Sequence, residues 1–273
     1  MNTAPIGIFD SGIGGLTVAR AIHELLPHES TIYLGDTARV PYGPKSPETV
    51  RRYSREIADW LSRQGVKAVV VACNTATAHA LSSLREQLPM PVIGVIEPGA
   101  RAAAASTQSG AVGVIGTAGT ISSGAYRRAL EASRPGARIV ERACPLFVPL
   151  VEEGWLSHPA TRAVAEEYLG TVRSAGVDVL VLGCTHYPLL KPLIGDVMGG
   201  DTALIDSAHE TARELVTVLQ RHGIAAPAGS VATHRYVVTD DVERFERVGA
   251  VFLGERLTGV EHVDVEAGIV AGA

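Results

Sequence analysis

Two cysteines of this chain stand in matched sequence contexts and could act together as bases. Cys73 and Cys184 each end a Val-rich apolar segment that begins after a glycine, and each is followed by small polar residues. A thiol has an ordinary pKa of ~8.5, so a suitable neighbour can make both thiol and thiolate accessible near neutral pH. Two such groups on opposite faces of a carbon can remove a proton from one face and return one to the other. The pair predicts a cofactor-independent, two-base inversion of a carbon centre.

Either cysteine alone is weak support, because a cysteine at the end of a buried strand is more often inert core packing. Their repeated context favours the catalytic interpretation. The third cysteine, Cys144, lies in Ala-Cys-Pro-Leu without a polar companion and is interpreted as structural.

The elements that would present these thiols are predicted from apolar periodicity. Short Val- and Ile-rich runs bounded by glycine or proline alternate with amphipathic stretches, which is typical of an α/β fold with mostly parallel sheets. The runs are 6–9, 32–34, 68–72, 92–96, 111–115, 177–182 and 203–205.

Three helices have clear sequence signals. Ser46 is the predicted N-cap of one helix and Pro47 its first residue. Ser207 with Glu210 predicts a capping box at the start of a second helix. The spacing of apolar residues over 242–252 predicts a helix near the C-terminus.

The two cysteine segments predict two pseudo-symmetric domains with the site in the cleft between them. Their separation, 184 − 73 = 111 residues, is about one small domain. Ligands of open α/β sheets bind at the carboxyl ends of strands, so facing domains would bring both thiols into one cleft. We expect a first domain of residues 1–97 plus 207–273 and a second of 98–206, with the break near Glu97-Pro98-Gly99.

Several loops could bind a substrate, although each has a plainer interpretation. The glycine-rich turn after Asp10 and Ser11 could hold a carboxylate at a helix N-terminus, or Asp10 could simply cap the helix. The loop containing Pro41, Tyr42 and Gly43 could close over a ligand or be a plain connector.

Polar residues near the second cysteine could likewise be part of a binding site or have a structural role. Thr117 and Thr120 could add hydroxyls to the cleft or cap the next helix. His186, two residues after Cys184, could favour the thiolate and orient a carboxylate, although a lone histidine is usually structural. Glu152 is a further candidate, or part of an exposed turn.

Composition excludes several other classes. The net charge is −5 and basic residues do not cluster, which argues against a nucleic-acid partner. No apolar run approaches the ~18 residues of a membrane span, and the N-terminus has no signal-like segment. Three cysteines do not suggest a disulfide framework, so we expect a reducing cytoplasm. No metal site is expected, since the only close ligand spacing is Cys-x-His. No lysine context suggests a pyridoxal cofactor.

Four motifs in order resemble the glutamate racemase family closely. The likeness covers nearly the whole chain and fades after about Gly254, which leaves the role of residues 255–273 open. The motifs are GIFDSGIGGLT (7–17), GDTARVPYG (35–43), ACNTA (72–76) and LGCTHYP (182–188).

The resemblance implies interconversion of L- and D-glutamate without a cofactor, supplying D-glutamate for peptidoglycan. It implies that Cys73 acts on the D enantiomer and Cys184 on the L enantiomer, with Asp10, Glu152 and His186 assisting proton transfer. We also expect a homodimer, although the sequence does not determine the oligomeric state, and regulation by cell-wall precursors and a protein partner such as DNA gyrase stay open. The residues it places around the substrate are Asp10, Ser11, Pro41, Tyr42, Gly43, Asn74, Thr75, Thr185 and His186.

Three alternatives are less well supported. A racemase of the same superfamily acting on aspartate or a hydantoin would not require all four motifs in full. A thiol hydrolase built on Cys184 and His186 would leave Cys73 without a role, and such pairs usually come from distant segments. A metal- or partner-binding protein would need more ligands than these cysteines and His186 provide.

Overall fold

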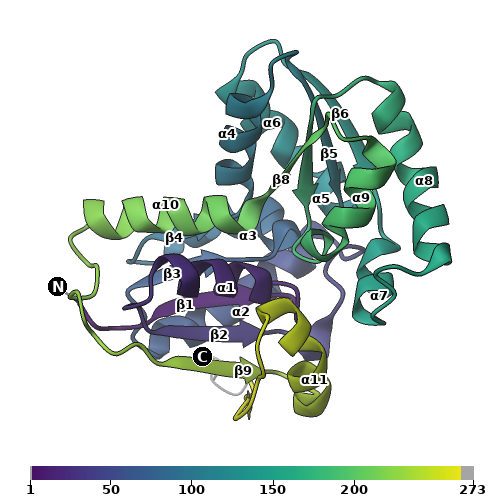
Figure 1. The fold of residues 1–273 in the computed structure, drawn as a ribbon. Coiled ribbons are helices and arrows are strands. Elements are labelled where there is room, and N and C mark those ends of the chain that lie inside the picture. Colours follow the sequence, from purple (N-terminus) through teal and green to yellow (C-terminus); the bar gives the residue numbers. More distant parts are fainter. Residues whose placement is uncertain (1, 266–273) are drawn as a thin grey trace.

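The chain folds into two lobes, each built on its own parallel sheet (Figure 1). The computed structural model describes residues 2–265. Residue 1 and residues 266–273, which the expected first domain includes, lie outside the described residues. Every strand pair within the described chain is parallel, which confirms the predicted α/β class.

The first lobe contains a sheet with the strand order β10-β9-β2-β1-β3-β4. The strands nearest its centre are fully buried, as expected when helices cover both faces. The strands are β1 (Ile6–Asp10), β2 (Thr31–Gly35), β3 (Ala68–Val71), β4 (Val92–Gly94), β9 (His234–Val238) and β10 (Glu261–His262).

The second lobe repeats this plan on a smaller scale, with the strand order β6-β5-β7-β8. The inner strands β5 and β7 are again buried along their whole length. The strands are β5 (Ala111–Gly116), β6 (Arg138–Ala143), β7 (Val179–Gly183) and β8 (Ala203–Asp206).

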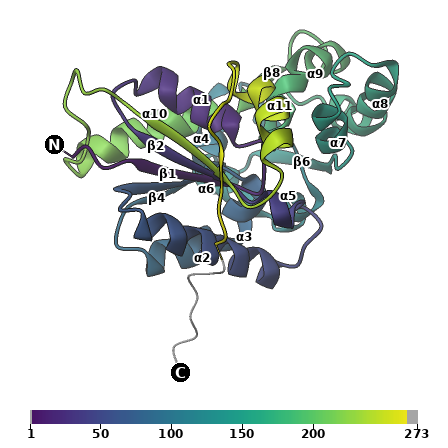
Figure 2. The same cartoon turned by 90° about the horizontal axis from the view of Figure 1, so that it is seen from below.

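Helices cover both faces of each sheet, as Figure 2 shows for the first sheet and Figure 1 for the second. On the first sheet, α1 (Leu16–Leu25), α10 (Ser207–Arg221) and α11 (Val242–Leu253) lie opposite α2 (Pro47–Arg63) and α3 (Asn74–Gln87). On the second sheet, α4 (Ile96–Ser106) and α6 (Ala125–Ser133) lie opposite α8 (Pro159–Ser174) and α9 (Lys191–Met198). The short helices are η1 (Thr37–Arg39), α5 (Ala118–Ser122), α7 (Phe147–Glu152) and η2 (Tyr187–Leu190).

The predicted elements are confirmed except at their ends and at sheet edges. All seven apolar runs contain a strand, although β4 stops at Gly94 and Ile96 already belongs to α4. The prediction missed β6, β9 and β10, which lie at or next to sheet edges. Their partly exposed, charged residues, such as Arg138 and Glu141 in β6, hide the apolar signal of a buried strand.

Helix starts are confirmed in part. Ser46 caps α2 and accepts a hydrogen bond from the Thr49 amide, and α11 begins at Val242 after Asp241. The capping box expected at Ser207 is wrong by one residue. The N-cap is Asp206, because its carboxylate accepts from the Ala208 amide.

The chain passes between the lobes at two places, the beginning of α4 and the junction of β8 with α10. The expected break at Glu97-Pro98-Gly99 lies inside the first turn of α4, where a proline is tolerated because its missing N–H needs no helical partner. The domain boundaries at 97/98 and 206/207 stay predictions. Residues 261–262 of the tail form the edge strand β10 of the first sheet.

We expect Leu180→Ala, in the fully buried strand β7, to lower the free energy of unfolding by about 2–5 kcal/mol. The substitution removes apolar contacts and leaves a cavity in the second lobe. Urea unfolding followed by circular dichroism measures the change. The matched control is Leu25→Ala, because the Leu25 side chain is 46% exposed. Equal losses in the two variants would contradict the core assignment.

Candidate active site

Cys73 lies at the carboxyl end of β3 and forms the N-cap of α3. Its sulfur accepts a hydrogen bond from the Ala76 amide at 3.4 Å, and its thiol donates to the Ser11 hydroxyl oxygen at 3.6 Å. Burial raises the pKa of this thiol to about 12, and the nearby charge of Asp10 adds to the rise, while the contacts with Ala76 and Ser11 oppose it. The group is therefore a protonated thiol at neutral pH.

Cys184 lies at the carboxyl end of β7 and faces a different set of neighbours. Its sulfur is 3.9 Å from Nδ1 of His186, whose Nε2 is 2.9 Å from Oε1 of Glu152. Burial opposes the charged form of His186, but the hydrogen bonds with Cys184 and Glu152 outweigh it and raise the pKa of the ring to about 10. The Cys184 sulfur therefore has a positively charged ring as its neighbour.

Arg244 extends this arrangement across the two lobes. It comes from α11 in the first lobe and donates to Oε2 of Glu152 at 3.0 Å. Burial alone would raise the pKa of the Glu152 carboxyl, but His186 and Arg244 hold it below its ordinary value. Arg244 could not be recognised from local sequence, because it meets its partner across 92 positions of the chain.

Asp10 ends β1 as a buried carboxyl group. Its Oδ2 accepts from the Gly12 amide at 2.9 Å, and its Oδ1 has no hydrogen-bond partner among residues 2–265. Burial raises the pKa of Asp10, although the nearby His186 charge opposes the rise. The alternative role as helix cap is wrong, because the N-cap of α1 is Gly15 and lacks a side-chain cap.

The two lobes are hydrogen-bonded to each other around the thiols. The hydroxyl of Thr75 is 2.9 Å from that of Thr117 and 3.2 Å from that of Thr120, and the Gly119 amide donates to the Gly43 carbonyl at 2.9 Å. Thr117 also caps α5. It therefore both contributes a hydroxyl between the lobes and caps the next helix.

The glycine-rich turn after β1 packs directly on the Cys184 loop. A Cβ placed on Gly14 would lie 2.3 Å from the Thr185 hydroxyl and 2.4 Å from Nδ1 of His186. Only a glycine permits this approach, which places the end of β1 against the end of β7.

These residues enclose a cavity of about 40 Å³ between the lobes. Both thiols line it, one from each sheet. Asp10, Thr120 and Glu152 lie outside its wall, and Val148 is the lining residue that the sequence did not reveal. The lining residues are Ser11, Pro41, Tyr42, Gly43, Cys73, Asn74, Thr75, Thr117, Val148, Cys184, Thr185 and His186.

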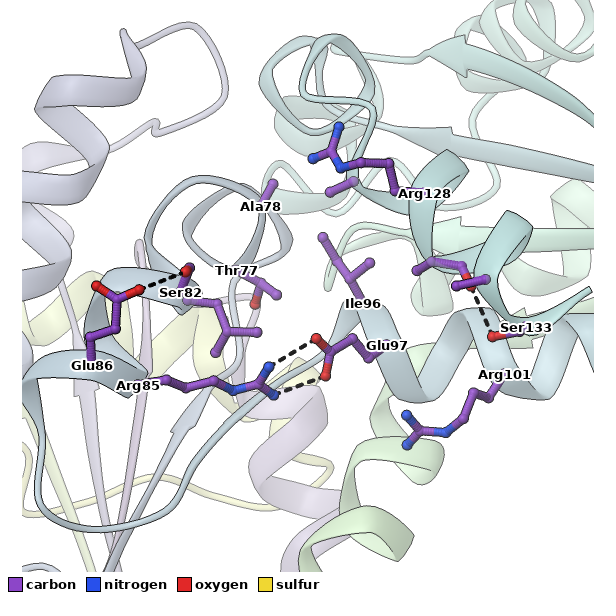
Figure 3. A pocket seen from close by; sticks show the side chains of 14 residues that line it. Thr77, Ala78, Ser82, Arg85, Glu86, Ile96, Glu97, Arg101, Arg128 and Ser133 are labelled. Atoms are coloured by element: carbon purple, nitrogen blue, oxygen red, sulfur yellow. Dashed lines mark hydrogen bonds and ion pairs between the residues drawn. The ribbon is translucent and has the colours of Figure 1, made fainter.

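A larger hollow of about 730 Å³ lies elsewhere, between α3, α4 and α6 (Figure 3). Arg85 and Glu97 face each other there in a two-pronged ion pair with both distances 2.9 Å. Neither thiol lines this hollow, so its size does not mark it as the place of the chemistry.

The described residues contain neither a cluster of metal ligands nor a helix suited to crossing a membrane. Within 2–265, no group of three or more His, Cys, Asp or Glu side chains is arranged to hold a metal ion. In the same part of the chain, no helix combines the length and the apolar character that crossing a membrane requires.

The fold and this site define a class of protein. Two parallel-sheet lobes that each contribute a thiol to one enclosed cavity are the arrangement of a two-base racemase that inverts a carbon bearing an acidic proton.

Comparison with known proteins identifies the family. Residues 10–215 match the family described as Asp/Glu/Hydantoin racemase. A glutamate racemase of Geobacter metallireducens is 56% identical over 262 residues, covering 96% of this chain and 97% of the relative. The solved glutamate racemase of Bacillus anthracis shares 43% identity with a TM-score of 0.93, covering 97% of this chain and 98% of that one. The chain therefore belongs to the Asp/Glu/hydantoin racemase family and groups within it with the glutamate racemases.

We expect Glu152→Gln to lower the pKa of His186, because the protonated ring loses its charged partner. In the wild type the pKa of His186 is raised to about 10, so the protonated ring stabilises the folded state. This stabilisation is complete below the ordinary pKa of 6.5 and decreases as the pH rises toward about 10. In Glu152→Gln this stabilisation should disappear at a lower pH than it does in the wild type. NMR titration of the histidine side chains, with urea unfolding across the same pH range, measures both effects.

The matched control is Glu153→Gln, which removes the neighbouring carboxylate and keeps the contact between Glu152 and His186. If the two variants shift the His186 titration equally, the contact does not set the charge of the ring.

Proposed function

We propose that this racemase interconverts L- and D-glutamate with Cys73 and Cys184 as its two bases. The observation that carries the proposal is that the two thiols, one from each sheet, line one enclosed cavity. A solved relative from Francisella tularensis, 36% identical with a TM-score of 0.92 and covering 98% of this chain and 100% of that one, is described in complex with D-glutamate. This supports glutamate rather than aspartate or a hydantoin as the substrate.

The protonation states of the site suit this reaction. A two-base inversion needs one base ionised and the other protonated. Burial keeps Cys73 protonated, and the charged His186 beside Cys184 favours its thiolate. In this state the Cys184 thiolate removes the Cα proton from L-glutamate, and the Cys73 thiol donates its proton to the opposite face. The product D-glutamate leaves the thiols in exchanged states, and the reverse reaction starts from Cys73.

The remaining polar residues are proposed to bind and orient the substrate. The buried Asp10 carboxylate lies outside the wall of the closed cavity and has one oxygen unpartnered within the described chain, so we propose that it aligns the substrate ammonium group when the lobes are separated. Three groups of residues hold the substrate carboxylates. They are the turn at Ser11, the loop at Pro41, Tyr42 and Gly43, and the residues that follow the two cysteines. Thr117 and Thr120 join the lobes through Thr75.

The described structure corresponds to a closed state of this cycle. A cavity of about 40 Å³ admits a few water molecules but not an amino acid of this size. Binding therefore requires the lobes to separate, and closure then strips water from the charged substrate so that weakly basic thiols can act.

In the cell, the proposed role is to supply D-glutamate for peptidoglycan in the cytoplasm. The proposed assembly is a homodimer. The mechanism uses the chain's own side chains and needs no added cofactor.

The test is solvent exchange at Cα in deuterated, metal-free and cofactor-free buffer. Wild-type protein given L-glutamate should form D-glutamate with deuterium at Cα. Cys73→Ala and Cys184→Ala should each lose about 10²–10⁴-fold in racemisation rate, because one base is missing. Cys144→Ala is the matched control and should keep the wild-type rate. Full racemisation in either of the first two variants would contradict the two-base proposal.

The same variants assign each thiol to an enantiomer. Cys73→Ala keeps Cys184, so it should exchange the Cα proton of L-glutamate faster than that of D-glutamate, and Cys184→Ala should show the opposite preference. Proton NMR of each pure enantiomer in deuterated water measures the exchange. The reversed pattern would contradict the assignment.

A further inference from the structure

The side chain of Tyr126, on α6 of the second lobe, touches both cysteine-bearing segments. Its ring packs under the residue before Cys184, since a Cβ placed on Gly183 would lie 2.8 Å from ring carbon Cε2. Its hydroxyl donates a hydrogen bond of 2.8 Å to Oδ1 of Asn74, the residue after Cys73. One fully buried side chain thus connects the end of β7 to the end of β3.

The contact with Tyr126 leaves one half of the Asn74 amide free. Asn74 is buried and lines the cavity between the lobes. Its Nδ2 has no hydrogen-bond partner among the described residues 2–265. A buried NH₂ group without a partner is costly unless a ligand accepts from it. Because Oδ1 is held by Tyr126, the amide can offer only donors to a bound molecule.

The Tyr126 hydroxyl also lies where the chain passes between the lobes. A Cβ placed on Gly99 in α4 would be 3.7 Å from this hydroxyl and 3.4 Å from Cβ of Ser207, the first residue of α10. Burial raises the pKa of Tyr126, and a hydrogen bond with Ser207 opposes the rise. The hydroxyl that holds Asn74 therefore lies beside both crossings of the chain between the lobes.

We propose that Tyr126 is a positioning residue of this racemase. Its hydroxyl fixes the Asn74 amide with NH₂ directed into the closed cavity, where it donates to a carboxylate oxygen of the amino acid. The inference rests on the proposed substrate site and adds to it a residue outside the cavity wall. It also explains why the amide is oriented only when the lobes are together, since Tyr126 and Asn74 come from different lobes.

The direct test is Tyr126→Phe, which keeps the ring against Gly183 and removes the hydroxyl. The Asn74 amide can then turn over and present oxygen to the substrate carboxylate. We expect KM to rise about 5- to 20-fold for both enantiomers, with kcat changed much less, since the lost donor contributes mainly to binding.

A double-mutant cycle separates this role from a general loss of packing. If Tyr126 acts through Asn74, Tyr126→Phe should have little further effect on KM in an Asn74→Ala background. The matched control is Tyr187→Phe, because Tyr187 is equally buried and donates to the Cys144 carbonyl at the same 2.8 Å. Its effect should add to that of Asn74→Ala. Additive behaviour of Tyr126→Phe would overturn the proposal.

Ser207→Ala keeps the proposal testable if Tyr126→Phe does not fold. It removes the Ser207 hydroxyl, which lies beside that of Tyr126 and influences its pKa, so a smaller rise in KM is expected, again absent in the Asn74→Ala background. An additive effect would overturn the proposal. If Asn74→Ala alone leaves KM unchanged in an active enzyme, the inference about Tyr126 fails while the racemase function stands. If the wild type does not racemise glutamate, the proposed function itself fails.

Discussion

Removing ionisable groups from water is the physical constraint on which this site depends. Cys73, Asp10 and His186 are all buried, and burial alone disfavours the charged form of each. The two sides of the cavity respond differently. Around Cys73 the neutral thiol is retained, whereas around Cys184 the contacts with His186, Glu152 and Arg244 support a positive charge. The two thiols therefore face different surroundings, a neutral one at Cys73 and a positively charged one at Cys184.

The need to approach one cavity from two sides explains why the molecule is built from two lobes instead of one. A single parallel sheet presents its strand ends along one edge, so its loops approach a ligand from one side. Two sheets facing each other bring one thiol from each lobe to the same cavity. The cost is that neither half is complete, and contacts such as Thr75 with Thr117 and Tyr126 with Asn74 form only when the lobes meet.

The interior of the fold was predictable because burial leaves a strong signal. The seven apolar runs contain strands, and the turn after Asp10 and the loops after Cys73 and Cys184 lie at strand ends as expected. The strands that escaped prediction lie at or next to sheet edges, where β6 and β9 carry exposed and charged residues. The start of α10 was misplaced by one residue because Asp206 and Ser207 are both good caps, and only the backbone geometry distinguishes them.

The sequence by itself determined the pair of thiols, the polar residues that follow them and the α/β plan, since each is encoded in a few neighbouring positions. The tertiary structure alone decided that the loops of both lobes enclose one cavity, that Glu152 is bound between His186 and Arg244, and that Tyr126 reaches Asn74. These contacts join residues from 34 to 92 positions apart. The periodicity of neighbouring residues cannot predict these long-range contacts. They depend on how the sheets pack and on where the chain crosses between the lobes.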